Sequence, residues 1–176
     1  MVYWQVIVLI KQTIFTSVIL LFLLCTPVMA IETPQISAKS AVLYDPLSDQ
    51  ILYAKNEEEV LGMASTTKIM TALVALEQYD LQQSVLVKKS WTGIEGSSMY
   101  LQEGEVLTLQ ELLYGLMLSS GNDAAVAIAE HIAGDTEQFA FLMNERARML
   151  GADANFVTPN GLDAQGHGAS SNEASR

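Results

Sequence analysis

The segment from Ser65 to Glu77 restricts the possible folds more than any other part of this sequence. After its first turn the segment is apolar around most of the circumference of a helix, which is typical of a helix surrounded by protein. Lys68 lies inside this run, although lysine is almost never fully buried unless it is paired. The pattern therefore predicts a buried helix that begins at or near Ser65. It also indicates that the Lys68 amine has a specific role within this helix.

A hairpin precedes this helix, and a second helix follows it. Two apolar or β-branched runs, 38–44 and 50–54, flank a cluster of turn-forming residues and predict a β-hairpin. Thr108 followed three residues later by Glu111 is typical of a capping box. The apolar residues that come next lie on one helical face, so we expect a helix that ends near Ser119.

Two more helices are predicted after Ser119. Asn122 opens an apolar segment, and Gly134 is expected to end it because glycine tolerates the left-handed conformation. Asp135 with Gln138 resembles another cap, leading a helix over 136–150 that stops at a further glycine. The predicted elements thus form a hairpin followed by helices.

Composition limits the classes of function. The 176 residues leave room for one domain, and 50% of them are hydrophobic, enough for a packed core. The formal net charge of −11 disfavours binding to nucleic acid or anionic lipid, because no basic surface is available to neutralise their charges. His131 and His167 have no ligand-forming residues at metal spacing around them, so no metal site is predicted and both are expected to be structural or solvated.

Residues 1–30 have the features of an export signal. They contain no acidic residue and a single base, Lys11, which is followed by an apolar run over 14–24. This run is too short to span about 30 Å of hydrocarbon, so the pattern favours a signal peptide cleaved after Ala30. An uncleaved anchor stays open, because a second apolar stretch precedes Lys11. The only cysteine, Cys25, would leave with the signal, and the mature chain would have no disulfide or thiolate.

Ser65 and Lys68 are the first candidate catalytic residues. Their spacing of three places both side chains on one face of a helix. A serine hydroxyl is a poor nucleophile at neutral pH, and a lysine accepts its proton only where a desolvated setting lowers the pKa of the amine. The apolar helix around Lys68 offers such a setting. The spacing alone is also explained by an N-cap serine followed by a surface lysine.

A second motif, Ser120-Gly121-Asn122, lies between two predicted helices, where a short loop can hold a hydroxyl and a carboxamide over a cleft. By itself it could be a plain helix cap. Together the Ser-x-x-Lys and Ser-x-Asn motifs resemble the penicillin-recognising serine enzymes. The surrounding sequence is similar to the low-molecular-mass D-alanyl-D-alanine carboxypeptidases, serine peptidase family S11. The blocks that carry this resemblance are 64–73, 96–101 with 104–105, 116–125 and 158–163.

The resemblance implies an α+β fold of the β-lactamase and transpeptidase type, with the helical subdomain present and the central antiparallel sheet incomplete. It implies that Lys68 takes the proton of Ser65, which attacks the carbonyl between two terminal D-alanines of a peptidoglycan stem peptide. Water then hydrolyses the acyl-enzyme. By the same resemblance Ser120 relays a proton toward the leaving amine, and Asn122 holds Lys68 and the substrate's amide.

The resemblance also implies partners and a location. β-Lactams would acylate Ser65 as substrate mimics, and no cofactor and no metal are required. A substrate in the cell wall suits export to the periplasm or to the extracytoplasmic face of the cell membrane, in agreement with the signal predicted in residues 1–30.

The sequence departs from the family at one motif, because no Lys-Thr-Gly follows Asn122. In the family this strand supplies a donor to the oxyanion hole and a cation for the substrate's carboxylate, and losing one oxyanion donor costs roughly 10²–10³ in rate. We therefore expect residues 31–165 to be the N-terminal part of a C-terminally truncated catalytic domain, and 166–176 to be an irregular tail. An inactive remnant of the family and a serine β-lactamase stay open as alternatives.

Overall fold

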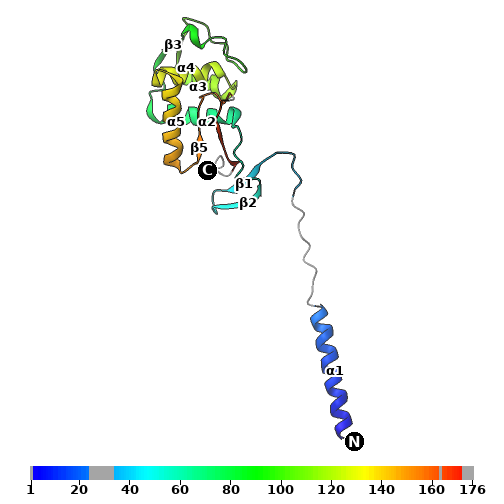
Figure 1. The fold of residues 1–176 in the computed structure, drawn as a ribbon. Coiled ribbons are helices and arrows are strands. Elements are labelled where there is room, and N and C mark those ends of the chain that lie inside the picture. Colours follow the sequence, from blue (N-terminus) through cyan, green and yellow to red (C-terminus); the bar gives the residue numbers. More distant parts are fainter. Residues whose placement is uncertain (1, 24–33, 163, 172–176) are drawn as a thin grey trace. The chain divides into compact units, whose positions relative to one another are not determined.

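The computed structural model of this protein describes residues 2–23, 34–162 and 164–171. The chain divides into two compact units, residues 1–37 and 38–176. The first unit contains helix α1 (Val2–Leu23), drawn in blue in Figure 1.

Two predictions for the start of the chain fall where the structure gives no description. Cys25 and the expected cleavage site after Ala30 lie outside the described residues. Among the helices of the described ranges, none combines the length and the apolar character that crossing a membrane requires. The signal peptide over residues 1–30 therefore stays a prediction.

The second unit combines helices with short antiparallel strand pairs (Figure 1). Strand β1 pairs with β2, β3 with β4, and β5 with β6. In chain order the elements, with η marking 3₁₀-helices, are β1 (Ala41–Asp45), β2 (Gln50–Lys55), η1 (Ala64–Thr66), α2 (Thr67–Gln78), β3 (Ser84–Leu86), η2 (Lys89–Trp91), β4 (Val106–Thr108), α3 (Leu109–Leu118), α4 (Asn122–Ala133), α5 (Thr136–Leu150), β5 (Ala154–Asn155) and β6 (Gly168–Ala169).

The predicted helix ends are confirmed because each depends on a local hydrogen-bonding pattern. At the start of α3, the Thr108 hydroxyl accepts a hydrogen bond from the Glu111 N–H, and the Glu111 carboxylate accepts one from the Thr108 N–H. Helix α4 ends at Gly134, whose φ is 91°, and α5 ends at Gly151, whose φ is 77°. The Asp135 side chain caps α5 by accepting from the Gln138 N–H.

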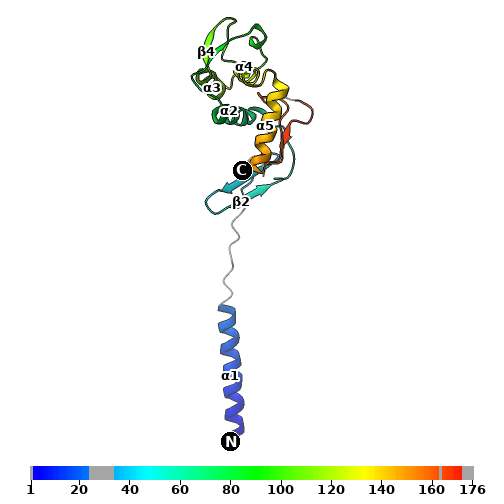
Figure 2. The ribbon, with the colours of Figure 1, turned by 90° about the vertical axis from the view of Figure 1, so that its left-hand side faces the viewer.

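Helix α2 is central to the second unit, because it contacts α3, α4 and α5 (Figure 2). Large side chains from these helices and from η2 fill the space between them and are excluded from solvent, as close packing requires. The largest of them are Trp91, Leu109, Leu112, Leu116, Ile128, Phe139 and Met143.

The prediction that α2 is buried on all sides is wrong for one face. Ile69 and Leu76 are 61% and 54% exposed, whereas Thr67, Lys68 and Thr71 are buried. Polar side chains can occupy the buried side because each of them finds a hydrogen-bond partner there. The helix is therefore oriented by its polar partners as well as by its apolar surface.

The structure differs from the expected irregular tail at residues 168–169, which form β6. This strand pairs with β5, and Ala169 also exchanges two main-chain hydrogen bonds of 3.1 Å with Leu61. Such a short strand is held by main-chain pairing and needs no alternation of apolar side chains, so a search for periodicity could not find it. The segment after residue 166 thus closes back onto the chain just before η1.

Candidate active site

Ser65 lies in the single turn of η1, immediately before α2. Its side chain is exposed at the surface, and the residue before it, Ala64, has a φ of 47°. A positive φ is uncommon for a residue with a Cβ and costs free energy that the surrounding structure must offset. The Thr66 hydroxyl donates to the Met63 carbonyl at 2.6 Å, a hydrogen bond that spans this turn. Ser65 is therefore presented on a tightly constrained turn.

Lys68 lies one helical turn after Ser65 and is only 3% exposed. Its Nζ is 3.3 Å from Ser65 Oγ and donates to the Asn160 carbonyl oxygen at 2.7 Å. Burial lowers the pKa of the Lys68 amine from its ordinary value of 10.5, because a desolvated site disfavours the charged form. A larger fraction of the amine is therefore neutral and able to take a proton from a neighbouring hydroxyl.

Ser120 reaches the same point from the loop between α3 and α4. Its Oγ donates to Ser65 Oγ at 3.0 Å, across 55 positions of sequence. Ser120 has a φ of 51°, another positive value for a non-glycine residue. The structure thus brings Ser65, Lys68 and Ser120 together as a connected group of two hydroxyls and one amine, which can move a proton between them.

Asn122, the fourth predicted site residue, is the first residue of α4 and is buried. Its Nδ2 donates to the Glu95 carbonyl oxygen at 2.6 Å, and its main-chain N–H donates to the Ser97 carbonyl at 2.8 Å. Among the described residues no hydrogen bond links Asn122 to Lys68. In this arrangement Asn122 fixes the loop over 95–97, and its predicted contacts with Lys68 and with a substrate stay predictions.

Asp123 was not singled out by the sequence, yet it organises one wall of the site. Its carboxylate accepts hydrogen bonds from the Ser98 hydroxyl and from three main-chain N–H groups, those of Met99, Leu101 and Ala124. Burial by itself raises the pKa of Asp123, but these hydrogen bonds together outweigh it and hold the pKa below its ordinary value. A single buried carboxylate therefore fastens the loop over 97–101 to the start of α4.

The segment over 156–161 forms a second wall, beside α2. The Asn160 carbonyl accepts from the Lys68 amine, and the Pro159 carbonyl accepts from the Thr71 hydroxyl at 2.6 Å. Gly161, with a φ of 79°, lies so close to the Ala64 carbonyl that a Cβ would overlap its oxygen. The sequence drew attention to this stretch through the resemblance of residues 158–163 to a family block, and residue 163 lies outside the described residues.

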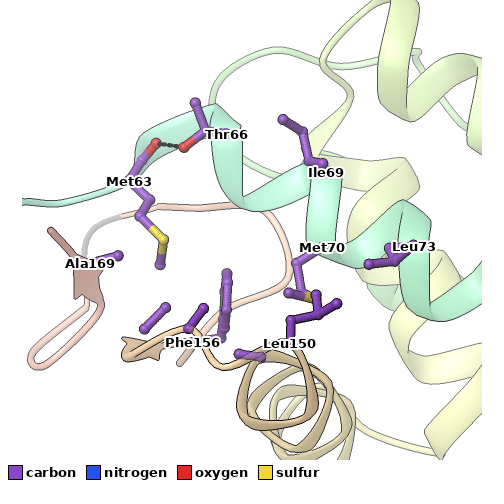
Figure 3. Close-up of a pocket in the computed structure, with 11 residues that line it drawn as sticks. Met63, Thr66, Ile69, Met70, Leu73, Leu150, Phe156 and Ala169 are labelled. Atoms are coloured by element: carbon purple, nitrogen blue, oxygen red, sulfur yellow. Dashed lines mark hydrogen bonds between the residues drawn. The ribbon is translucent and has the colours of Figure 1, made fainter. Parts of the chain in front are cut away.

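A separate apolar pocket of about 240 Å³ lies beside α2 and does not include Ser65. Figure 3 shows Met70 and Leu73 of α2 facing Leu150 of α5 and Phe156. The lining carries no titratable side chain, and its other members are Met63, Thr66, Ile69, Ala147, Ala152, Ala154 and Ala169. This pocket supplies no group that could take part in acid–base chemistry.

Comparison with known proteins agrees with these motifs. A family model described as D-alanyl-D-alanine carboxypeptidase matches residues 27–175. The chain belongs to this family. The D-alanyl-D-alanine carboxypeptidase DacF of Bacillus subtilis (strain 168) is 41% identical over 136 residues, which cover 74% of this chain and 35% of the relative. DacC of Escherichia coli (strain K12) is 38% identical over 148 residues, 77% of this chain and 37% of the relative.

Solved structures of the family share the fold. The D-alanyl-D-alanine carboxypeptidase of Mycobacterium tuberculosis H37Rv matches with a TM-score of 0.75 and 35% identity over 82% of this chain and 55% of that structure. Penicillin binding protein 5 of Haemophilus influenzae matches with a TM-score of 0.77 and 35% identity over 82% of this chain and 45% of that structure. The predicted α+β fold of the transpeptidase type is confirmed, and the chain spans about half of each solved relative.

We expect Gly161→Ala to destabilise the protein more than the same change at Gly93. Both glycines have positive φ, 79° and 72°, so both variants carry a left-handed alanine that costs roughly 1–2 kcal/mol. Space is open around Gly93, whereas the new methyl group at Gly161 would overlap the Ala64 carbonyl oxygen. Urea denaturation should show an additional loss of about 1–3 kcal/mol for Gly161→Ala. Equal losses would mean that the segment moves away from Ala64 without cost.

We expect Asp123→Asn to lower the free energy of unfolding by about 3 kcal/mol at neutral pH, because an amide cannot accept all of the hydrogen bonds that the carboxylate accepts. The pKa of Asp123 is lowered in the folded state, so its contribution is present above the ordinary carboxyl pKa of 3.8 and is lost as the pH falls through the folded value. Chemical denaturation at neutral and acidic pH measures this difference. Asp80→Asn, at an exposed turn, is the matched control, and a similar loss there would contradict the assignment.

Proposed function

We propose that this chain carries the nucleophile and the base of a serine-type D-alanyl-D-alanine carboxypeptidase. The observation that supports the proposal best is the convergence of Lys68 Nζ at 3.3 Å and Ser120 Oγ at 3.0 Å on Ser65 Oγ. Membership of the family and the carboxypeptidase activity for which its relatives are named support the reaction type. The matched residues span 35% and 37% of the length of the two curated relatives. That this chain has the activity of those longer proteins is therefore also part of the proposal.

In the proposed acylation step, the neutral Lys68 amine accepts the Ser65 hydroxyl proton as Ser65 Oγ attacks the carbonyl carbon between two terminal D-alanines. The C–N bond then breaks and an ester forms on Ser65. The proton travels from the Lys68 ammonium through the Ser120 hydroxyl to the nitrogen of the departing D-alanine. Because the amine and both hydroxyls already lie near one another, little rearrangement is needed for this transfer.

In the proposed deacylation step, water attacks the ester carbonyl and gives its proton to Lys68, and the proton returns to Ser65 Oγ as the ester C–O bond breaks. Asn122 is assigned to the substrate's amide and to the Lys68 amine. Its position at the start of α4, beside Ser120, supports this role. No metal or cofactor enters either step.

The proposed substrate is a peptidoglycan stem peptide, and the proposed inhibitors are β-lactams that acylate Ser65. The likeness to a solved penicillin binding protein supports the second assignment. A wall substrate places the proposed enzyme outside the cytoplasm, with residues 1–30 as its export signal. Lys-Thr-Gly does not occur after Asn122 in this sequence, so the first experiment asks whether Ser65 reacts in the chain as it stands.

Labelling of the purified chain with a fluorescent penicillin tests the nucleophile. We expect one covalent adduct, located on Ser65 by peptide mass spectrometry, and its complete loss in Ser65→Ala, because among the described residues Ser65 carries the hydroxyl that is hydrogen-bonded to the Lys68 amine. Ser90→Ala, at an exposed serine in η2, should label like the wild type. An unlabelled wild-type chain alongside a labelled Escherichia coli relative would overturn the proposal for this chain.

The pH dependence of labelling tests the base. Because burial lowers the pKa of Lys68 from 10.5, the rate of acylation should rise with pH and level off above that lowered pKa, where the amine is neutral. Lys68→Arg should reduce the rate by about 10²–10⁴-fold at neutral pH, because a guanidinium stays protonated. Stopped-flow measurement of the acylation rate against pH checks both. A rate that does not fall as the pH is lowered, over the whole range in which the chain stays folded, would argue against Lys68 as the base.

A further inference from the structure

His167 is a buried histidine outside the group of Ser65, Lys68 and Ser120. It is 9% exposed and packs edge-on against Phe156, with ring centroids 6.1 Å apart. Its Nδ1 accepts a hydrogen bond from the Val157 N–H at 3.0 Å, and its Nε2 lies 2.8 Å from Thr67 Oγ1. Because a main-chain N–H can only donate, Nδ1 must be unprotonated, and the neutral ring carries its proton on Nε2. Nε2 therefore donates to the Thr67 hydroxyl.

Both partners of His167 belong to parts of the candidate site. Thr67 is fully buried and lies between Ser65 and Lys68 on the first turn of α2. Val157 begins the run that leads, three residues later, to Asn160. The imidazole thus joins the turn that presents the nucleophile to the segment that holds the base.

Two side chains of α2 bind this segment directly, and a third, Thr67, reaches it through His167. Thr67 meets His167, the Lys68 amine donates to the Asn160 carbonyl at 2.7 Å, and the Thr71 hydroxyl donates to the Pro159 carbonyl at 2.6 Å. These contacts lie in a row along the helix. Those to Asn160 and Pro159 bind one continuous stretch of main chain, to which His167 is joined through the Val157 N–H. The bond through His167 closes the row at its Ser65 end.

The Asn160 carbonyl sets where the Lys68 amine points. Among the described residues the hydrogen bonds of Lys68 Nζ go to this carbonyl and to Ser65 Oγ. A main-chain carbonyl moves with its segment, so a shift of the segment changes the direction of the amine. A misplacement of about 1 Å in a reacting group can cost as much as about 10² in rate.

We propose that His167 is a positioning residue for the Ser65–Lys68 pair, which it aligns by fastening the Asn160 segment to Thr67. His167 acts on this pair through its hydrogen bonds with Val157 and Thr67. This inference rests on the proposed function, because it assigns a role in a reaction that uses Lys68 as base.

Two substitutions at His167 separate the hydrogen bonds from the volume of the ring. Glutamine carries an acceptor and a donor on one carbon, as the imidazole does, so His167→Gln can bond to both Val157 and Thr67. His167→Leu fills similar space and bonds to neither. His131→Leu, at the other histidine of the chain, is the matched control. His131 lies in α4, and its buried Nε2 has no hydrogen-bond partner among the residues that the structure describes.

The test measures the first-order acylation rate constant with a fluorescent penicillin, together with the amount of label at saturation. We expect His167→Leu to lower the rate constant about 10- to 100-fold, and His167→Gln and His131→Leu to stay within about threefold of wild type. A role in folding alone would reduce the amount of label and the melting temperature while the labelled fraction reacts at the wild-type rate. That outcome would overturn the proposal.

Thr67→Val keeps the experiment decisive if His167→Leu fails to fold. This variant preserves the shape of Thr67 and removes the hydroxyl that accepts from Nε2. It should lower the rate constant in the same direction, and combining it with His167→Leu should add little, because both changes break one connection. Fully additive effects in the double variant would mean that the two residues act independently and would contradict the inference.

A second readout does not depend on acylation of Ser65. Acetic anhydride modifies accessible neutral amines, and peptide mass spectrometry gives the rate at Lys68. In a Ser65→Ala background His167→Leu should change this rate at least about threefold, whereas His167→Gln should not. If the wild-type chain is not labelled by penicillin, the proposed function fails, and the Lys68 rate still decides the positioning role. An unchanged rate in folded His167→Leu would refute it.

Discussion

The burial of one amine is the constraint on which the rest of the site depends. Lys68 is almost excluded from water, and a buried ammonium or amine without partners would cost several kcal/mol. The Asn160 carbonyl supplies the partner, so the chain after β5 has to return to α2 at this point. The same return path brings Gly161 close to Ala64 and pairs β6 with Leu61.

The two walls of the site are held in different ways. On the Asn160 side, polar side chains of α2 reach out to main-chain carbonyls of a segment without regular structure. On the Ser120 side, the main-chain N–H groups of Met99 and Leu101 in a loop, together with that of Ala124 in α4, converge on one carboxylate, Asp123. In both cases a buried polar group is satisfied by backbone from a distant part of the chain. The Ser65 hydroxyl meets Lys68 on the first side and Ser120 on the second.

Local signals explain what the sequence could predict. Caps and glycines act within a few residues, so the ends of α3, α4 and α5 were predicted within a residue or two, and the i, i+3 spacing placed Ser65 near Lys68. The sequence could not indicate that a main-chain carbonyl holds the amine, because any residue carries one. Asp123 resembles an ordinary first-turn residue of a helix. The short strands β3 to β6 depend on pairing across long separations, which periodicity does not record.

The contacts that define the site join residues far apart in sequence. Ser120 meets Ser65 across 55 positions, Lys68 meets Asn160 across 92, and Thr67 meets His167 across 100. Closing such loops costs conformational entropy, which a single contact does not offset. Contacts of this kind therefore form together, when the whole unit folds. In an unfolded chain Lys68 has an ordinary solvated amine and Ser65 an inert hydroxyl. The proposed reactivity of Ser65 therefore requires the native state, and an unfolded chain would not be acylated at this residue.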